Sequence, residues 1–210
     1  MKSSIALKLV LGTAALALPL AALAESNVQT GTATATGATA HVDFQITIPK
    51  ILYLRVGTGS SYTTGVLAAN TNIDLITFAP TAAQLGSGAV AGTGGDLLNG
   101  TETAAIVSNS GNVTLNATAA GALSDGAGDS IAFTQITTAV ATNTSTTALP
   151  APTLANGASA NVVLPAPATK VISEDAKWKF SYTNSAVVPT GTYGGVNTNN
   201  SRIVYTATMP

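Results

Sequence analysis

The sequence predicts an all-β protein, an immunoglobulin-like antiparallel β-sandwich with Greek-key connections. Charged residues are only 8% of the chain, against roughly 25% in an ordinary soluble domain, and Thr, Ala, Gly, Ser and Asn take their place. Short alternating or apolar stretches are separated by turn residues, and no long amphipathic helix follows the N-terminal stretch. This pattern is typical of sandwiches. A small closed β-barrel is the alternative.

The first 24 residues have the features of a secretory signal peptide. Lys2 and Lys8 form a basic start, residues 9–21 are apolar, and residues 22–24 read Ala-Leu-Ala, a small-x-small cleavage site. The apolar run is shorter than the about 20 residues of a membrane-spanning helix. We therefore expect an exported bacterial protein, cleaved after Ala24, that works in the periplasm, at the cell surface or outside the cell.

The remaining chain is divided into a low-complexity arm, residues 25–40, and a single β-sandwich domain, residues 41–210, which is an ordinary domain size. Loss of Lys2 and Lys8 leaves 8 − 2 = 6 basic against 9 acidic residues, a formal charge of −3. Without a basic cluster, we expect no nucleic-acid partner and no direct membrane insertion. The chain has no cysteine, which excludes disulfides and a lipid-modified cysteine.

Residues 41–48 carry the strongest strand signal in the N-terminal part of the chain. Every second residue is apolar, and polar residues alternate with them, which predicts a half-buried strand. Pro49 ends the pattern. The apolar residues are Val42, Phe44, Ile46 and Ile48.

The other strands follow from apolar or alternating stretches bounded by Gly, Pro, Asn or Asp. The sequence Ser-Asn-Ser-Gly-Asn at residues 108–112 predicts a hairpin turn. Residues 57–70 and 85–100 are predicted loops. Trp178, Phe180 and Tyr182 alternate along one strand and are predicted to lie in the core. The remaining strands are expected at residues 51–56, 73–78, 103–107, 113–117, 131–137, 160–164, 177–183 and 202–209.

The sequence contains no pattern that predicts catalysis. His41 is the only histidine, and a Ser-His-Asp triad would have to use it; its place at a strand start predicts an ordinary polar position. One histidine and no cysteine leave no transition-metal site, and no spacing of carboxylates suggests a glycosidase. We therefore predict a protein that is not an enzyme, with no catalytic, cofactor-binding or metal-binding residues and no cofactor. A secreted hydrolase centred on His41 is a remaining alternative.

Two acidic pairs are candidate sites. Asp125 and Asp129, in a Gly-rich stretch, could contribute carboxylates to Ca²⁺, but an ordinary turn explains them. Glu174 and Asp175 precede a strand and are predicted to form a solvated charged corner beside Lys177.

The C-terminal third resembles fimbrial subunits of Gram-negative bacteria and related exported β-sandwich proteins. The resemblance lies in Pro189-x-Gly191-Thr192-Tyr193, followed by the alternating strand of residues 202–209. It implies an incomplete sandwich whose missing strand comes from the N-terminal arm of a neighbour, a form of β-strand addition. Residues 27–40 would be the donor.

Together these features predict a structural subunit of a fimbrial-type or other cell-surface assembly. The expected partners are further copies, other surface subunits and a periplasmic chaperone. The alternative is a surface or periplasmic binding module, an adhesin or carbohydrate binder that uses the loops at residues 57–70 or 85–100. An exposed Trp178, Phe180 and Tyr182 would then offer a stacking platform for sugars.

Overall fold

The computed structural model describes residues 26–31, 37–59 and 67–210. The chain separates into two units between Ile48 and Pro49, so the compact unit begins at Pro49 and not at His41. The described chain is all-β apart from two short 3-10 turns, η1 (Ala82–Gln84) and η2 (Phe133–Gln135). None of the helices in these described ranges has the length and apolar character to span a membrane.

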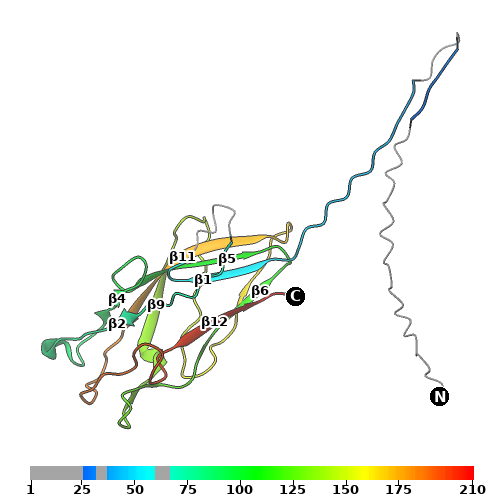
Figure 1. The fold of residues 1–210 in the computed structure, drawn as a ribbon. Helices are drawn as coiled ribbons and strands as arrows, with labels where there is room; N and C mark the ends of the chain where they lie inside the picture. The colour runs from blue at the N-terminus through cyan, green and yellow to red at the C-terminus, as the bar shows by residue number, and fades with distance from the viewer. Residues whose placement is uncertain (1–25, 32–36, 60–66) are drawn as a thin grey trace, which may run out of the picture. The chain divides into compact units, whose positions relative to one another are not determined.

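The larger sheet has five antiparallel strands in the order β1-β5-β11-β3, and β9 also pairs with β11. Figure 1 shows β1, β5 and β11 side by side. The strands are β1 (Leu52–Val56), β3 (Val90–Ala91), β5 (Thr101–Ser108), β9 (Ile136–Ala141) and β11 (Ile172–Tyr182).

The second sheet has three antiparallel strands in the order β10-β6-β12, and two small two-stranded sheets pair β2 with β4 and β7 with β8. Each sheet is open along its path, so the described strands do not close into a barrel. The strands are β2 (Ile76–Thr77), β4 (Thr93–Gly94), β6 (Val113–Ala119), β7 (Leu123–Ser124), β8 (Ser130–Ile131), β10 (Val162–Leu164) and β12 (Ile203–Thr208).

Residues of both main sheets contribute to one hydrophobic core cluster. Ile106 on β5, Leu115 on β6 and Trp178 on β11 are all 0% exposed. The Trp178 ring stacks at a tilt on Tyr205 of β12, with centroids 5.4 Å apart, and its Nε1 donates a hydrogen bond to the Leu149 carbonyl at 2.8 Å. Trp178, Phe180 and Tyr182 are buried, which confirms their prediction as core residues.

The hairpin predicted at residues 108–112 is wrong. Both flanking strands exist, but β5 pairs with β1 and β11, whereas β6 pairs with β10 and β12. The turn therefore carries the chain from one sheet to the other. Turn residues specify a reversal of direction, and whether the reversed strand pairs with its predecessor depends on where its apolar residues find a core.

The strand predicted at residues 41–48 is also not formed. Residues 37–50 contain no strand, and each of them is exposed. Alternation is a local pattern, and a strand also needs a neighbouring strand to pair with, which the pattern does not supply.

The predicted solvated corner is wrong for Asp175, which is 0% exposed. A crossing segment covers it: Ser145 N donates to its carboxylate at 2.7 Å, Thr144 Oγ1 at 2.7 Å and Asn143 Nδ2 at 2.7 Å. Burial alone would raise the pKa of Asp175, but these hydrogen bonds outweigh burial and hold it far below its usual range. Asp175 is thus a buried, charged anchor for residues 143–145.

Candidate assembly site

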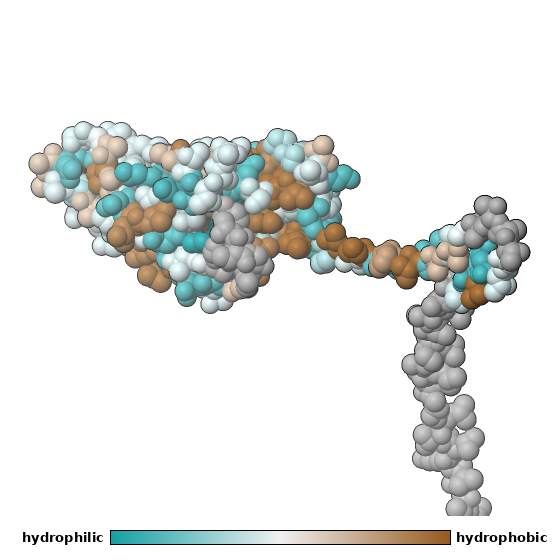
Figure 2. Space-filling view, turned by 90° about the horizontal axis from the view of Figure 1, so that it is seen from above, coloured by the Kyte–Doolittle hydropathy of each residue, from teal (hydrophilic) through white to brown (hydrophobic). Residues whose placement is uncertain are grey.

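Residues 41–48, which we term the apolar segment, present large apolar side chains to solvent. Val42 is 71% exposed, Phe44 88%, Ile46 86% and Ile48 75%. Figure 2 shows hydrophobic residues along the stretch of chain that leads into the compact unit. Burying one such side chain contributes about 2 kcal/mol, so this exposure leaves a large hydrophobic contribution unused.

The apolar segment has one apolar and one polar side when extended. Successive side chains of an extended chain point in opposite directions, so the four apolar residues share one side. Asp43, Gln45 and Thr47 lie on the other. A surface that accepted this segment as a strand would therefore be apolar beneath it and open to water above it.

In the compact unit, β1 and β12 are neighbours at the margin of the two main sheets. In the described part of the chain, β1 has β5 as its strand partner and β12 has β6; β1 and β12 do not pair with each other. The side chains that these two strands turn toward the core are only half-buried, whereas those of the central strands are almost fully buried. We term this margin the β1/β12 edge. Its inward side chains are Leu52, Leu54, Val56, Ile203, Tyr205, Ala207 and Met209.

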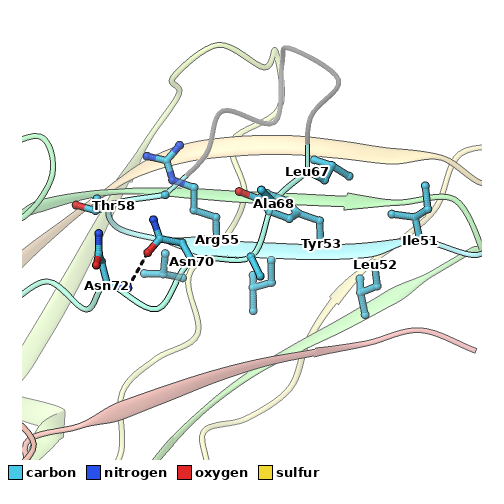
Figure 3. Close-up of a pocket in the computed structure, with 13 residues that line it drawn as sticks. Ile51, Leu52, Tyr53, Arg55, Thr58, Leu67, Ala68, Asn70 and Asn72 are labelled. Carbon is cyan, nitrogen blue, oxygen red and sulfur yellow. Dashed lines mark hydrogen bonds between the residues drawn. The ribbon is translucent and has the colours of Figure 1, made fainter.

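A groove of about 560 Å³ runs along β1. It is lined by residues 51–56 together with Thr58, Gly59 and residues 67–70 and 72. In Figure 3, Leu52 points from β1 toward the side where β12 lies, and Ile51 and Arg55 point the other way. The groove therefore borders the β1 part of the β1/β12 edge, Leu52, Leu54 and Val56, and none of its lining residues is on β12.

Three acidic residues, Asp74, Asp96 and Glu102, form a cluster near the C-terminal end of β1. Arg55 Nη2 lies 2.9 Å from Asp96 Oδ2, and the Asp96 carboxylate accepts the Thr103 amide at 2.7 Å. Asp74 accepts the Thr58 hydroxyl at 2.9 Å. These contacts attach the segments on both sides of residues 60–66, and the loop after β4, to the larger sheet.

Glu102, on β5, is the buried member of this cluster at 4% exposed. Burial raises the pKa of Glu102 to about 8; the Asp96 amide, which donates to it at 3.2 Å, opposes the rise, and the charges of Asp74 and Asp96 add to it. The sequence analysis missed this group. The available signal is its place two residues before Ala104 and four before Ile106, which puts it on the inward face of the strand.

The sequence-predicted candidates lie apart from this site or are used structurally. Asp125 Oδ1 accepts the amides of Ala127, Gly128 and Asp129 at 2.8, 3.1 and 3.0 Å, as in an ordinary Asx turn. The described residues hold no group of three or more His, Cys, Asp or Glu side chains arranged for a metal. His41 begins the apolar segment, outside the compact unit.

The loops and arm are described in part. Residues 85–100 contain β3 and β4 rather than one long loop. In the loop at residues 57–70, residues 60–66 lie outside the described chain. In the expected donor arm, residues 32–36 lie outside it as well, and the described residues 27–31 and 37–40 are exposed and form no strand.

Comparison with protein-family models, with characterised proteins and with solved structures finds no match to this chain. We therefore infer a function from the apolar segment and the β1/β12 edge alone.

Proposed function

We propose that this protein is an exported bacterial structural subunit of a fimbrial-type or other cell-surface assembly, and that its copies associate by β-strand addition. The observation that carries the proposal is the exposure of four large, alternating apolar side chains in the apolar segment. The signal-peptide pattern of residues 1–24 and the low charge support export and assembly.

The donor in this proposal is the apolar segment. The resemblance to fimbrial subunits implied residues 27–40 as donor, but Val28 is the only large apolar side chain there. A donated strand gains affinity from main-chain hydrogen bonds and specificity from alternate side chains that enter pockets. Residues 41–48 have those alternate side chains, and residues 27–40 do not.

The acceptor is the β1/β12 edge of a second copy. The two main sheets then form an immunoglobulin-like sandwich that lacks one strand, and the donated strand covers the half-buried Leu52, Leu54 and Tyr205. The polar side chains Asp43, Gln45 and Thr47 would face solvent. The match is between the four apolar side chains of the donor and the half-buried apolar side chains of the β1/β12 edge.

The double substitution Phe44→Ser with Ile46→Ser tests the proposal in the full mature chain. Removal of two apolar side chains from the donor row is expected to weaken self-association at least tenfold, because each contributes about 2 kcal/mol when buried. Association would be measured by light scattering during size-exclusion chromatography and by electron microscopy.

The matched control is Gln45→Ser with Thr47→Ser, which changes the polar side of the same segment and should leave association unchanged. Deletion of residues 25–40 separates the two donors: it should leave association intact if residues 41–48 are the donor. A mature chain that is monomeric at all concentrations, or equal behaviour of the two double variants, would contradict the proposal.

The alternative proposal, a binding module for carbohydrate, has less support. Trp178 is 0% exposed and donates its indole N–H to Leu149, so it offers no platform for a sugar ring. We propose no catalytic role for this site.

A further inference from the structure

Asn109, in the turn between β5 and β6, holds the backbone at the base of the apolar segment. Its Nδ2 donates to the Pro49 carbonyl at 2.8 Å, and its Oδ1 accepts the Ile51 amide at 2.8 Å. Its own backbone N–H donates to the Ile51 carbonyl at 3.4 Å. A carboxamide side chain offers one donor and one acceptor, as a peptide group does. Asn109 therefore continues the β1–β5 ladder beyond its last strand pair, Leu52 with Ser108.

The neighbouring residues further restrict this junction. Pro49 fixes its own φ and biases Ile48, which precedes it, toward an extended conformation. Lys50 Nζ donates to the carbonyl of Pro210, the last residue of the chain. Residues 49–51 are thus bonded to the β5–β6 turn and to the end that follows β12, and Ile48 comes directly before them. No residue lies between Pro49, whose carbonyl accepts from Asn109, and Ile48, the last of the four apolar residues of the apolar segment.

We propose that Asn109 is a positioning residue for assembly: it holds the donor segment at its base, so that the segment enters a second copy without a flexible linker. This inference rests on the proposed function. A donor that is held at its base loses less conformational freedom on binding and has a higher effective concentration at a correctly placed acceptor. Asn109 belongs to the donor copy in this role and does not contact the donated strand of another copy.

The test separates the donor role from the acceptor role in full mature chains. A fluorescently labelled donor chain is mixed with a large excess of an acceptor chain whose own donor row is silenced by Phe44→Ser and Ile46→Ser. The measured quantity is the amount of mixed dimer at each acceptor concentration. Asn109→Ala in the donor chain should raise the half-saturating acceptor concentration about tenfold. The same substitution in the acceptor chain should change the half-saturating acceptor concentration by less than about twofold.

Asn112→Ala is the matched control, because Asn112 lies in the same turn and its Oδ1 accepts the Ala166 amide at 2.9 Å without touching residues 49–51. It should have no effect in either chain. If Asn109→Ala raised the half-saturating acceptor concentration equally in the donor and in the acceptor chain, Asn109 would have a general structural role. If the substitution in the donor chain left that concentration unchanged, Asn109 would have no role in assembly. Either result overturns the inference. If two chains with native Asn109 fail to form a mixed dimer, the proposed function itself fails.

Discussion

At the scale of single residues, Glu102 and Asp175 show two ways to bury a carboxyl group. Asp175 is surrounded by donors on Asn143, Thr144 and Ser145 and stays charged. Glu102 has one amide donor and two acidic neighbours, and its pKa rises to about 8. Donors therefore favour the ionised form at one position, and burial beside other carboxylates favours the protonated form at the other.

The raised pKa of Glu102 predicts that stability falls as pH rises. The pKa is about 8 in the folded chain and near the ordinary 4.5 in the unfolded chain. Between these two values the unfolded state releases its proton and the folded state keeps it, so the free energy of unfolding decreases across this range. Glu102→Gln, which carries no proton to lose, should remove most of this decrease, which amounts to about 5 kcal/mol at pH 9.

Urea denaturation at pH 5, 7 and 9 measures this effect. The control is Asp43→Asn, in the apolar segment outside the compact unit, which should leave the pH profile as it is. A Glu102→Gln variant with the same pH profile as the native chain would contradict the prediction.

At the scale of elements, the loop from β4 to β5 depends on two glycines that touch. Gly100 has φ +69°, and a Cβ there would lie 2.7 Å from the Gly92 Cα. The amide of Phe180 also donates to the Gly100 carbonyl at 2.8 Å, which joins this loop to β11. Backbones can approach so closely only where neither residue has a side chain.

Gly100→Ala should therefore destabilise the compact unit by about 3 kcal/mol, because it combines a left-handed backbone with a backbone clash. The loss would be measured as a lower urea midpoint. Gly157→Ala is the control: a Cβ at Gly157 meets nothing within 4 Å, and its effect should stay below about 1 kcal/mol. Equal midpoints for the two variants would show that the contact between Gly92 and Gly100 carries little stability.

The sequence predicted the existence of elements better than their partners. The alternation of Trp178, Phe180 and Tyr182 correctly predicted the inward face of β11, because burial on one face leaves a local pattern. At residues 108–112 the prediction of a change in chain direction was correct, but the prediction of a hairpin was wrong, because strand pairing depends on residues far away in the sequence. Asp175 looked exposed because the segment that covers it is 30 residues away in the chain.

The apolar segment shows the same limit for the candidate site. Its period-2 pattern predicted a half-buried strand that the structure does not form, because no local signal distinguishes a strand of its own domain from one offered to another copy. The exposure of Phe44 and Ile46 supports the proposed second possibility, and it is visible only in the folded structure. Asn109 carried no sequence signal beyond turn chemistry, because its partners Pro49 and Ile51 lie about 60 residues earlier.

At the scale of the whole molecule, low charge predicts how assembly responds to salt. Only 8% of residues are charged, and the proposed contact joins apolar side chains. Salt screens attraction between exposed charges and leaves hydrophobic burial largely unaffected at moderate concentrations. Raising NaCl from about 0.05 M to about 0.5 M should therefore change the association constant by less than about threefold.

Analytical ultracentrifugation across this salt range checks the prediction. The Phe44→Ser, Ile46→Ser chain should remain dissociated throughout. Dissociation of the native chain at high salt would indicate that charged groups, and not the donor row, hold copies together.

The placement of β5 and β6 in different sheets has a consequence for how the chain reaches its native state. β5 pairs with β1 before it in the chain, and with β11 across 64 positions or more, as Ile172 does with Ser108. Proteins dominated by such distant pairings fold slowly, because loop-closure entropy is lost before the contacts form. The apolar segment precedes all of these strands, so it is exposed for the whole of that time. During folding, residues 41–48 are therefore a site at which the chain can aggregate, and a factor that shields them would raise the yield of native protein.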